Sequence, residues 1–306
     1  GIDMNIHITK TYNIGGLIGL RQNSVRNAAE KMGYKEMSLF RFPDIYDTDE
    51  DLNVRMEGIT SALCPNDIVI FQHPSGESPR YDTFLYEHIK ACSGTKIVAF
   101  VQEAASRRTN IEYSLQEEID LLNRADMYIF ASELLRKYYL ENGLMEKPYI
   151  IQKVSDYLTD ISVNRHNGKK LYLMRDADGE SCPNSYADVE VITYDEYHAA
   201  EIILKLSEGG MGLICNQDET ALGIYMAAGI PVIIKKGLPG EEYVTSHKIG
   251  LAASDLNDIY RNLMSLTEDS MRTYYDNVKK LQGLFTNGMY TQKLLIDTVL
   301  MVKEML

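Results

Sequence analysis

Short apolar runs alternate along the chain with longer stretches whose apolar residues recur at helical spacing. Asp67–Phe71 and Lys96–Val101 have the length and composition of buried parallel strands. In Asn23–Met32 the apolar residues follow a helical period and Gly33 comes next, as at the end of an amphipathic helix. The other strands predicted in the first half are Asn5–Thr9, Met37–Phe40 and Met127–Ala131, and the other helices are Asp49–Leu63, Tyr81–Ala91, Ile111–Asn123 and Glu133–Glu141. This alternation predicts an α/β fold with a parallel, doubly wound sheet.

A polar break at Leu144–Pro148 separates this series from a second one of the same kind. Its predicted strands are Lys170–Met174, Val189–Thr193, Gly212–Cys215, Val232–Ile234 and Leu251–Ala252, and its predicted helices are Glu201–Leu206, Ala221–Ala228, Asp255–Met264 and Glu268–Gly283. A last helix, Tyr290–Leu306, follows a turn. The 306 residues suffice for two domains. The sequence therefore predicts two Rossmann-like domains, 4–150 and 151–288, and a C-terminal helix at 289–306.

The stretch Leu213–Lys236 is the centre of the second series. It reads LICNQDETALGIYMAAGIPVIIKK, which predicts a strand, an acidic loop, a helix of small residues and a second strand. In open α/β sheets ligands bind beyond the carboxyl ends of the strands, and a helix amino terminus there offers N–H groups to phosphate. Any βαβ unit of a Rossmann-like domain would show the same spacing. The residues at this position, which we take as donor-site candidates, are Asp218, Glu219, Thr220 and Ala221.

The composition indicates which binding partners the protein can have and where in the cell it is expected. A formal net charge of −13 argues against a nucleic-acid partner, because phosphate backbones are bound by clustered Lys and Arg. No apolar run approaches the ~18 residues of a membrane span and no signal peptide is evident, so we expect a soluble, cytoplasmic protein. Cys64, Cys92, Cys182 and Cys215 lack metal-binding spacing and are expected to be free thiols.

Five segments, taken in order, resemble one group of sugar transferases. They are RQNSVRNAAEKMGYKEMSLF, DIVIFQHP, EGGMGLI, MAAGIPVII and FTNGMYTQKLL. Together they resemble GT-B glycosyltransferases, in particular the glucosyltransferase 3 family that extends O-linked sugars on streptococcal serine-rich-repeat adhesins. The resemblance implies two Rossmann-like domains whose parallel sheets face a central cleft, with a C-terminal helix that crosses back to the first domain.

The resemblance also implies a donor site in the second domain. Arg175 follows the first strand there and can hold a diphosphate through two contacts. It can equally be a solvated residue paired with Asp176 or Asp178. Tyr194 and Tyr197 follow the next strand, where a nucleobase can stack on an aromatic ring.

One further donor-site candidate lies after the central stretch. Glu242 resembles the acidic residue with which many GT-B enzymes contact the ribose or the sugar of the donor. A solvent-facing glutamate beside Glu241 is the alternative. The central stretch itself departs from the family, because relatives carry a lysine near the diphosphate where this chain has Ala221.

In the first domain the resemblance points to the loop Tyr12–Gly19, which GT-B enzymes use in the interdomain cleft. Its glycines allow a close approach of the backbone to a ligand. A flexible turn is the alternative. The candidate residues of this cleft loop and its flank are Asn13, Gly15, Gly16 and Gln22.

The catalytic residues of the family are replaced in this chain. Relatives carry a His–Asp pair after the fourth strand, where this chain has Gln102 and Glu103. Glutamine cannot act as a general base, which leaves Glu103 and, nearby in sequence, His73 as candidates. A histidine with no motif around it is also often structural.

The resemblance implies that a hexose is transferred from a nucleotide sugar, expected to be UDP-linked, to a glycan or glycosylated protein. No cofactor and no metal are expected, and the Asp176–Asp178 DAD sequence is best read as a loop. Relatives form homo-oligomers, so at least a dimer is expected. The alternative is a catalytically impaired glycosyltransferase-like subunit that acts as a binding or regulatory partner, which the departures at Ala221 and Gln102 motivate.

Overall fold

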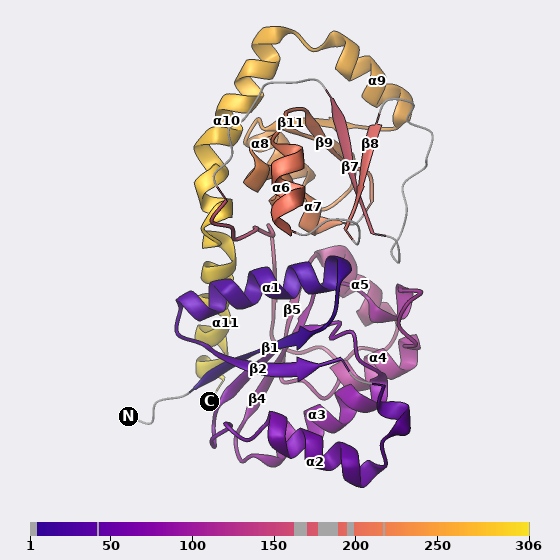
Figure 1. Cartoon of the computed structure of the whole chain (residues 1–306), viewed down its shortest axis with the longest axis vertical. Helices are drawn as coiled ribbons and strands as arrows, with labels where there is room; N and C mark the ends of the chain where they lie inside the picture. Colours follow the sequence, from indigo (N-terminus) through magenta and orange to yellow (C-terminus); the bar gives the residue numbers. More distant parts are fainter. Residues whose placement is uncertain are drawn as a thin grey trace. The chain divides into compact units, whose positions relative to one another are not determined.

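The protein folds as two α/β units (Figure 1). A computed structural model describes residues 5–41, 43–161, 170–176, 189–194, 199–216 and 218–305, without the side chain of Leu256. Unit 1 comprises Gly1–Gln152 together with Gln292–Leu306, and unit 2 comprises Lys153–Thr291. The last stretch of the chain therefore returns to the unit in which the chain began.

Unit 1 is built on a six-stranded parallel sheet in the order β2-β1-β3-β4-β5-β6. Its strands are β1 (Ile6–Tyr12), β2 (Lys35–Phe40), β3 (Ile68–His73), β4 (Lys96–Val101), β5 (Met127–Phe130) and β6 (Tyr149–Ile151). Its helices are α1 (Gly16–Lys31), α2 (Asp49–Ile59), α3 (Pro79–Ala91), α4 (Leu115–Leu122), α5 (Glu133–Glu141) and most of α11 (Met289–Glu304), with short 3-10 turns η1 (Asp44–Tyr46) and η2 (Ala105–Arg107).

Alternate residues of the central strands of unit 1 enter two separate cores. On β3, for example, Val69 and Phe71 pack with α2, α3, α4 and α5, whereas Ile68 and Ile70 pack with α1 and α11. Because successive strand residues point to opposite faces, a strand covered on both sides must be apolar throughout. This arrangement accounts for the unbroken apolar runs in the sequence.

Unit 2 holds a five-stranded parallel sheet in the order β11-β10-β9-β7-β8. Its strands are β7 (Leu171–Arg175), β8 (Val189–Thr193), β9 (Met211–Ile214), β10 (Val232–Lys235) and β11 (Gly250–Ala253). Its helices are α6 (Ala199–Leu206), α7 (Glu219–Ala228), α8 (Glu241–Ser246), α9 (Leu256–Ser265) and α10 (Glu268–Thr286). Helix α7 is buried along its length and packs against both α6 and α10.

Local sequence signals explain where many helices begin. Thr48 and Ser114 each form a capping box with an acidic residue three positions later, at the starts of α2 and α4. Ser78 and Ser132 accept backbone N–H groups at the starts of α3 and α5. These caps satisfy N–H groups that would otherwise lack partners within the helix.

The observed elements confirm the α/β prediction with two parallel sheets, and they correct several boundaries. Strand β1 extends to Tyr12 and α1 begins at Gly16, so the loop expected over Tyr12–Gly19 is limited to Asn13–Gly15. Strand β6 and helix α8 were not predicted from the sequence.

The cysteine prediction is only partly right. Cys64 and Cys92 are free thiols, as expected. Cys215 is disulfide-bonded, so the prediction of a free thiol is wrong at this position. Cys182 lies outside the described residues.

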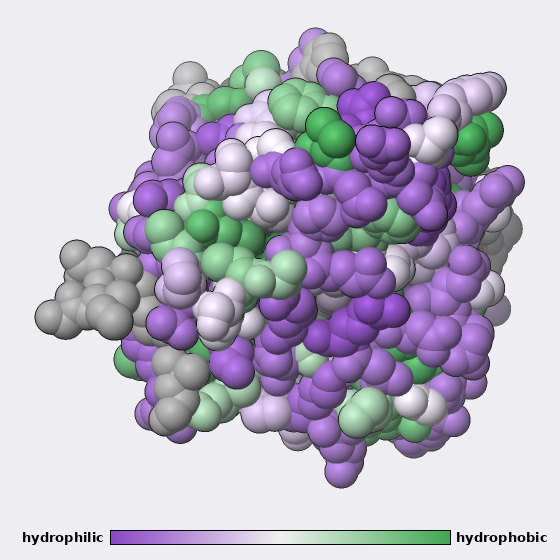
Figure 2. Space-filling model, turned by 90° about the horizontal axis from the view of Figure 1, so that it is seen from below, coloured by the Kyte–Doolittle hydropathy of each residue, from purple (hydrophilic) through white to green (hydrophobic). Residues whose placement is uncertain are grey.

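None of the helices in the described residues combines the length and apolarity needed to cross a bilayer. On the face shown in Figure 2, hydrophilic side chains predominate and apolar ones lie in groups between them.

Candidate functional site

The sheet of unit 2 opens between β7 and β9 at its carboxyl edge. Strand β8 lies on one side of β7, and β9, β10 and β11 follow on the other, so the strand order reverses at this pair. Their ladder ends at Leu173 and Leu213. Beyond it, the hydroxyl of Tyr225 from α7 accepts from Met174 N (3.0 Å) and donates to Leu213 O (2.9 Å). Ligands of open α/β sheets bind at such a reversal, which makes this opening the candidate ligand site of unit 2.

Asp218 caps the helix that starts beside this opening. Its Oδ1 accepts from the backbone N–H groups of Thr220 and Ala221, both at 3.1 Å. Its Oδ2 accepts from the hydroxyl of Tyr194 at 2.7 Å. A carboxylate of the protein itself therefore occupies the positive end of the α7 dipole.

Most donor-site candidates gather at the start of α7, and Glu242 lies apart from them. Tyr194, Asp218, Thr220 and Ala221 are brought together, and Tyr194, at 3% exposure, holds Asp218 through its hydroxyl. Arg175 is joined to this cluster by its backbone, since its carbonyl accepts from Tyr194 N at 3.0 Å, while its side chain is exposed.

The two acidic candidates flank the cluster. Glu219 is the first residue of α7, whereas Glu242 is exposed on α8, beyond β10. Tyr197 and Asp178 lie outside the described residues. Asp176, the other carboxylate weighed as a partner for Arg175, is buried.

Unit 1 has a corresponding opening between β1 and β3. The ladder of these strands ends at Ile8 and Ile70, and the strand order reverses here too. Beyond this point, Gln22 of α1 accepts from Thr11 N (2.7 Å) and donates to Pro74 O (3.0 Å), so it bridges the two strand ends.

Two further glutamines extend this bridge into a buried glutamine network of Gln22, Gln72 and Gln102. The side chain of Gln72 donates to Thr9 O and to Gln22 O, and Gln102 donates to Gln72 Oε1 at 2.9 Å. All three side chains are buried. Gln22, which the sequence placed in a cleft loop, and Gln102 therefore both hold strand ends in place.

The amino terminus of α1 differs from that of α7. Gly15 is the N-cap and supplies no side chain, and the first turn carries no acidic residue. Asn13 is exposed with φ of 61°, a left-handed conformation that asparagine tolerates. The backbone N–H groups of this turn are thus not capped by a side chain, and they stand at the carboxyl edge of the sheet.

Glu103 is held between two arginines at the end of β4. Its Oε1 accepts from Arg21 Nη2 (2.5 Å) and from Arg108 Nη1 (2.7 Å). Both arginines are buried, and the side chain of Glu103 remains 22% exposed. The charge-assisted bonds fix the carboxylate at a place that solvent reaches.

His73, in contrast, belongs to the core. Its side chain has no exposed surface, and its Nε2 lies 2.6 Å from Glu118 Oε2. Burial alone would raise the pKa of Glu118, but hydrogen bonds from His73, Ser106 and Ala105 N hold that pKa below its ordinary value. This placement indicates a structural role for His73, which leaves Glu103 as the accessible member of the two catalytic candidates.

A second buried carboxyl lies near the start of α3. Asp82 accepts from Ser75 Oγ (2.7 Å) and from Tyr113 Oη (3.1 Å). Burial raises the pKa of Asp82 well above its ordinary value, against the effect of these hydrogen bonds.

Sequence reasoning missed Arg21, Arg108, Gln72 and Tyr225. Arg21 and Gln72 have partners 82 and 30 positions away in the sequence. The pairs Arg108–Glu103 and Tyr225–Leu213 lie closer in the sequence. Only Arg108 had a local signal, as an arginine shortly after the candidate Glu103. Within the described residues, no group of three His, Cys, Asp or Glu side chains is arranged to hold a metal ion.

Two family models cover most of the chain. The model described as the glucosyltransferase 3-like N-terminal domain matches residues 5–154, and that of the glucosyltransferase 3-like C-terminal domain matches residues 169–298. The chain is similar to glucosyltransferase 3 of Streptococcus gordonii, at 28% identity over 98% of this chain and 99% of the relative. It is also similar to glucosyltransferase 3 of Streptococcus parasanguinis, at 23% identity over 97% of this chain and 98% of the relative.

Solved structures share the fold at low sequence identity. HepE of Anabaena in complex with UDP and glucose superposes with a TM-score of 0.63 at 10% identity, covering 97% of this chain and 99% of that one. An α-glucosyltransferase in complex with UDP gives 0.61 at 14% identity, with 97% and 100% covered. Sucrose-phosphate synthase of Thermosynechococcus elongatus gives 0.61 at 12% identity, with 98% and 100% covered. These likenesses confirm the GT-B-like fold prediction.

Proposed function

The chain belongs to the glucosyltransferase 3-like family, and from that premise we propose that it transfers a hexose from a UDP-linked sugar to a glycan or glycosylated protein. The observation that carries the proposal is the match over nearly the full length of two curated glucosyltransferases. Structural neighbours in complex with UDP or UDP-glucose support the choice of nucleotide.

We assign donor binding to unit 2, at the opening between β7 and β9. Arg175 is exposed at the end of β7, and in this proposal its guanidinium holds the diphosphate through two hydrogen bonds. The N–H groups of Thr220 and Ala221 already bond to Asp218. In this proposal Asp218 and Tyr194 position α7, and the positive charge for the phosphates comes from Arg175, with Lys235 and Lys236 further along the same edge.

We assign the acceptor side to unit 1. Glu103 is fixed by Arg21 and Arg108 and is reached by solvent, so it can accept a hydrogen bond from an acceptor hydroxyl. Catalysis would then consist mostly of positioning and of electrostatic stabilisation of the departing diphosphate. The expected homo-oligomer, the cytoplasmic location and the absence of a cofactor stay predictions.

The test of the donor site is calorimetric titration with UDP. Arg175→Ala should weaken UDP binding by roughly 1.5–3 kcal/mol, the contribution of a charge-assisted hydrogen bond, and should leave uridine binding unchanged. Arg272→Ala is the matched control, because Arg272 is an exposed arginine of the same unit on α10.

The same titrations separate the proposal from its alternative. Release of UDP from a UDP-sugar by the wild-type chain supports an enzyme. If millimolar UDP and UDP-sugars do not bind at all to a folded protein, the alternative of a catalytically impaired partner subunit replaces the proposal.

A further inference from the structure

Strand β2 forms one edge of the sheet in unit 1, and one side of its backbone is open. Arg41 N donates to Tyr12 O, so in a parallel ladder the odd-numbered residues of β2 face β1. Glu36, Ser38 and Phe40 then direct their N–H and C=O groups outward. Within the described residues, no hydrogen bond to these backbone groups is found.

A groove runs beside this open edge. It has a volume of about 480 Å³, which lies in the range of protein ligand sites. One wall is the outward side of β2, and another is the face of α2 that carries Arg55, Gly58 and Ile59. A Cβ added at Gly58 would meet no atom within 4 Å, so the absence of a side chain at this position leaves the groove unobstructed.

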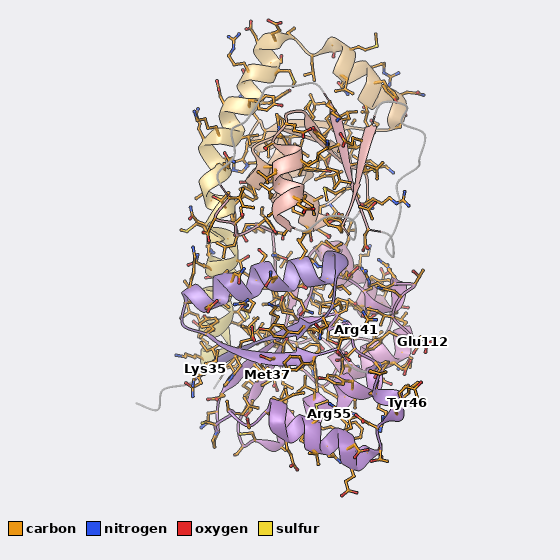
Figure 3. All side chains as sticks on the ribbon, viewed as in Figure 1. Lys35, Met37, Arg41, Tyr46, Arg55 and Glu112 are labelled. Atoms are coloured by element: carbon orange, nitrogen blue, oxygen red, sulfur yellow. The ribbon has the colours of Figure 1, made fainter. Side chains whose placement is uncertain are left out.

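Two unmatched cations stand at the two ends of the strand. Lys35 is the first residue of β2 and Arg41 directly follows its last, so the two lie near opposite ends of the strand (Figure 3). By the alternation of strand side chains they belong to the same face as Met37. Neither has a carboxylate within 4.0 Å in the described part of the chain, whereas Arg55 pairs with Asp47 at 2.8 Å and Arg26 pairs with Glu36 at 3.3 Å. The charged residues that line the groove, Glu36 and Arg55, are already paired, so the positive charge of Lys35 and Arg41 beyond its two ends suits those ends to a segment with acidic residues.

We propose that the groove between β2 and α2 binds an extended, acidic segment of the acceptor polypeptide as an added strand. The unpaired backbone groups of β2 provide the hydrogen bonds, as in other cases of strand addition to a sheet edge. Lys35 and Arg41 select carboxylates six positions apart. This proposal rests on the proposed function, because β2 runs to the carboxyl edge of the sheet where Glu103 lies, so a bound segment leads to the acceptor side.

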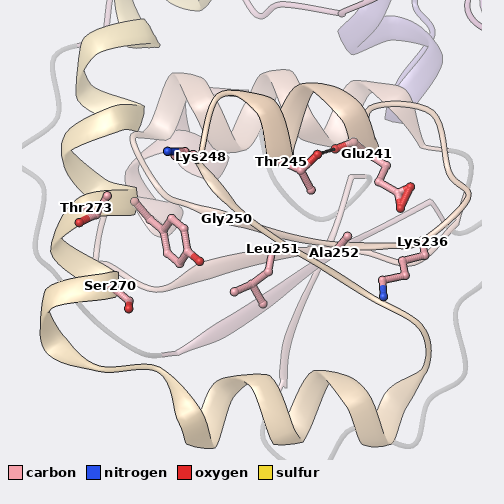
Figure 4. Close-up of a pocket in the computed structure, with 10 residues that line it drawn as sticks. Lys236, Glu241, Thr245, Lys248, Gly250, Leu251, Ala252, Ser270 and Thr273 are labelled. Carbon is pink, nitrogen blue, oxygen red and sulfur yellow. Dashed lines mark hydrogen bonds between the residues drawn. The ribbon is translucent and has the colours of Figure 1, made fainter.

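The edge of the sheet in unit 2 provides a useful contrast. A groove of about 580 Å³ follows β11, and Lys236 and Lys248 stand near its two ends (Figure 4). Strand β11 has only four residues, whereas β2 has six. Period-two pairing gives β11 two outward residues, Gly250 and Ala252, while β2 offers three, so the longer ladder makes β2 the better docking edge.

The first experiment measures binding of a labelled peptide of about ten residues, alternating threonine and valine, with two glutamates six positions apart. The full chain should bind it, and a peptide with glutamine in place of both glutamates should bind at least tenfold more weakly. Absence of any binding at millimolar peptide would overturn the proposal.

Three variants then locate the peptide. Gly58→Leu fills the groove and replaces a glycine in the last turn of α2, so it should weaken binding at least tenfold while the melting temperature stays equal or rises. Asn53→Leu, on an exposed position of the same helix outside the groove, is the control. Ser38→Pro removes one outward N–H, which edge strands tolerate, and should also weaken binding.

The outcomes distinguish the docking surface from the enzymatic activity. Unchanged peptide binding in both Gly58→Leu and Ser38→Pro would overturn the proposal, even if Lys35→Glu and Arg41→Glu weaken binding, since charge alone would then hold the peptide. Release of UDP from UDP-sugars without acceptor should be the same in all these variants. If the wild-type chain releases no UDP from UDP-sugars, that result would instead contradict the proposed function.

Discussion

In both units side chains connect two neighbouring strand ends that the sheet leaves unpaired, but the side chains differ. In each sheet the strand order reverses at one pair of strands, and their ladder stops short of the carboxyl edge. In unit 1 three buried amides, Gln22, Gln72 and Gln102, connect the strand ends. In unit 2 a single phenol, that of Tyr225, does so.

The difference extends to the helix that follows each opening. Helix α1 begins at Gly15 without a side-chain cap, whereas α7 begins at Asp218, whose carboxylate takes two N–H groups. One helix amino terminus therefore remains available to a ligand, and the other is satisfied from within. A shared fold thus does not imply that both openings bind anions in the same way. Substitutions at Gly212, Tyr225 and Gln22 should break this contrast, and a fourth at Asp82 concerns the buried charge of unit 1 alone.

The largest effect is expected from Gly212→Ala in β9. A Cβ there would lie 2.3 Å from ring atoms of Tyr225, so the ring would have to leave its place over the strand. Overpacking together with the lost hydrogen bonds should reduce the free energy of unfolding by roughly 3–5 kcal/mol. Chemical denaturation measures this free energy of unfolding. The control is Gly58→Ala in α2, where the added Cβ meets no neighbouring atom and stability should rise. Equal stabilities of the two variants would contradict this account of Gly212.

Tyr225→Phe removes only the hydroxyl. Met174 N–H and Leu213 C=O then lose a buried partner, at a cost of about 3 kcal/mol. Tyr172→Phe is the matched control in the same unit, because the hydroxyl of that buried tyrosine donates one longer hydrogen bond, 3.3 Å, to Gly209 O. Amide exchange at Met174 should accelerate in the first variant only. If both variants lose the same stability, the phenol is not what holds β7 and β9.

Gln22→Leu tests the opening of unit 1. The change leaves Thr11 N–H and Pro74 C=O without their partner, but Gln72 still joins Thr9 to the network. We therefore expect a smaller loss than for Tyr225→Phe, about 2 kcal/mol by chemical denaturation. A loss larger than that of Tyr225→Phe would show that Gln72 and Gln102 do not compensate for the lost hydrogen bonds of Gln22.

Per pH unit, the smallest effect is the one expected from the titration of Asp82. Because burial raises the pKa of Asp82, the folded state keeps a proton that the unfolded state releases near pH ~4. The folded state then binds more protons, and the free energy of unfolding falls as pH rises above that value. Asp82→Asn cannot titrate, so its slope between about pH 4 and 6 should be less negative, by at most ~1.4 kcal/mol per pH unit. Parallel pH profiles would contradict the raised pKa.

The sequence predicted the long, periodic elements well because apolar spacing depends on burial within a single element. It missed β6, a three-residue strand directly after Pro148, since three residues carry no period. It also assigned Gly16–Gly19 to a loop, because glycine is read as a turn signal although α1 begins there.

The candidate site was harder to predict for a physical reason. The stretch around α7 was located correctly, because strand, loop and helix follow one another in the chain. The partners of its side chains were not, since the pairing of Tyr194 with Asp218 spans 24 positions and that of Arg21 with Glu103 spans 82. Asp218, directly before the helix, is itself a typical N-cap signal, but its charge was predicted to face the ligand.

The return of α11 to unit 1 has a consequence for biosynthesis. Leu294, Leu295, Val299 and Val302 fill the core beside α1, yet they are translated after the whole of Lys153–Thr291. At ~5–20 residues per second, the ribosome needs on the order of ten seconds for that interval. During this time one face of the first sheet has α1 but lacks the part of its cover that α11 provides. We expect nascent chains stalled before Gln292 to engage chaperones that recognise exposed apolar surface, and to be released once the final helix emerges.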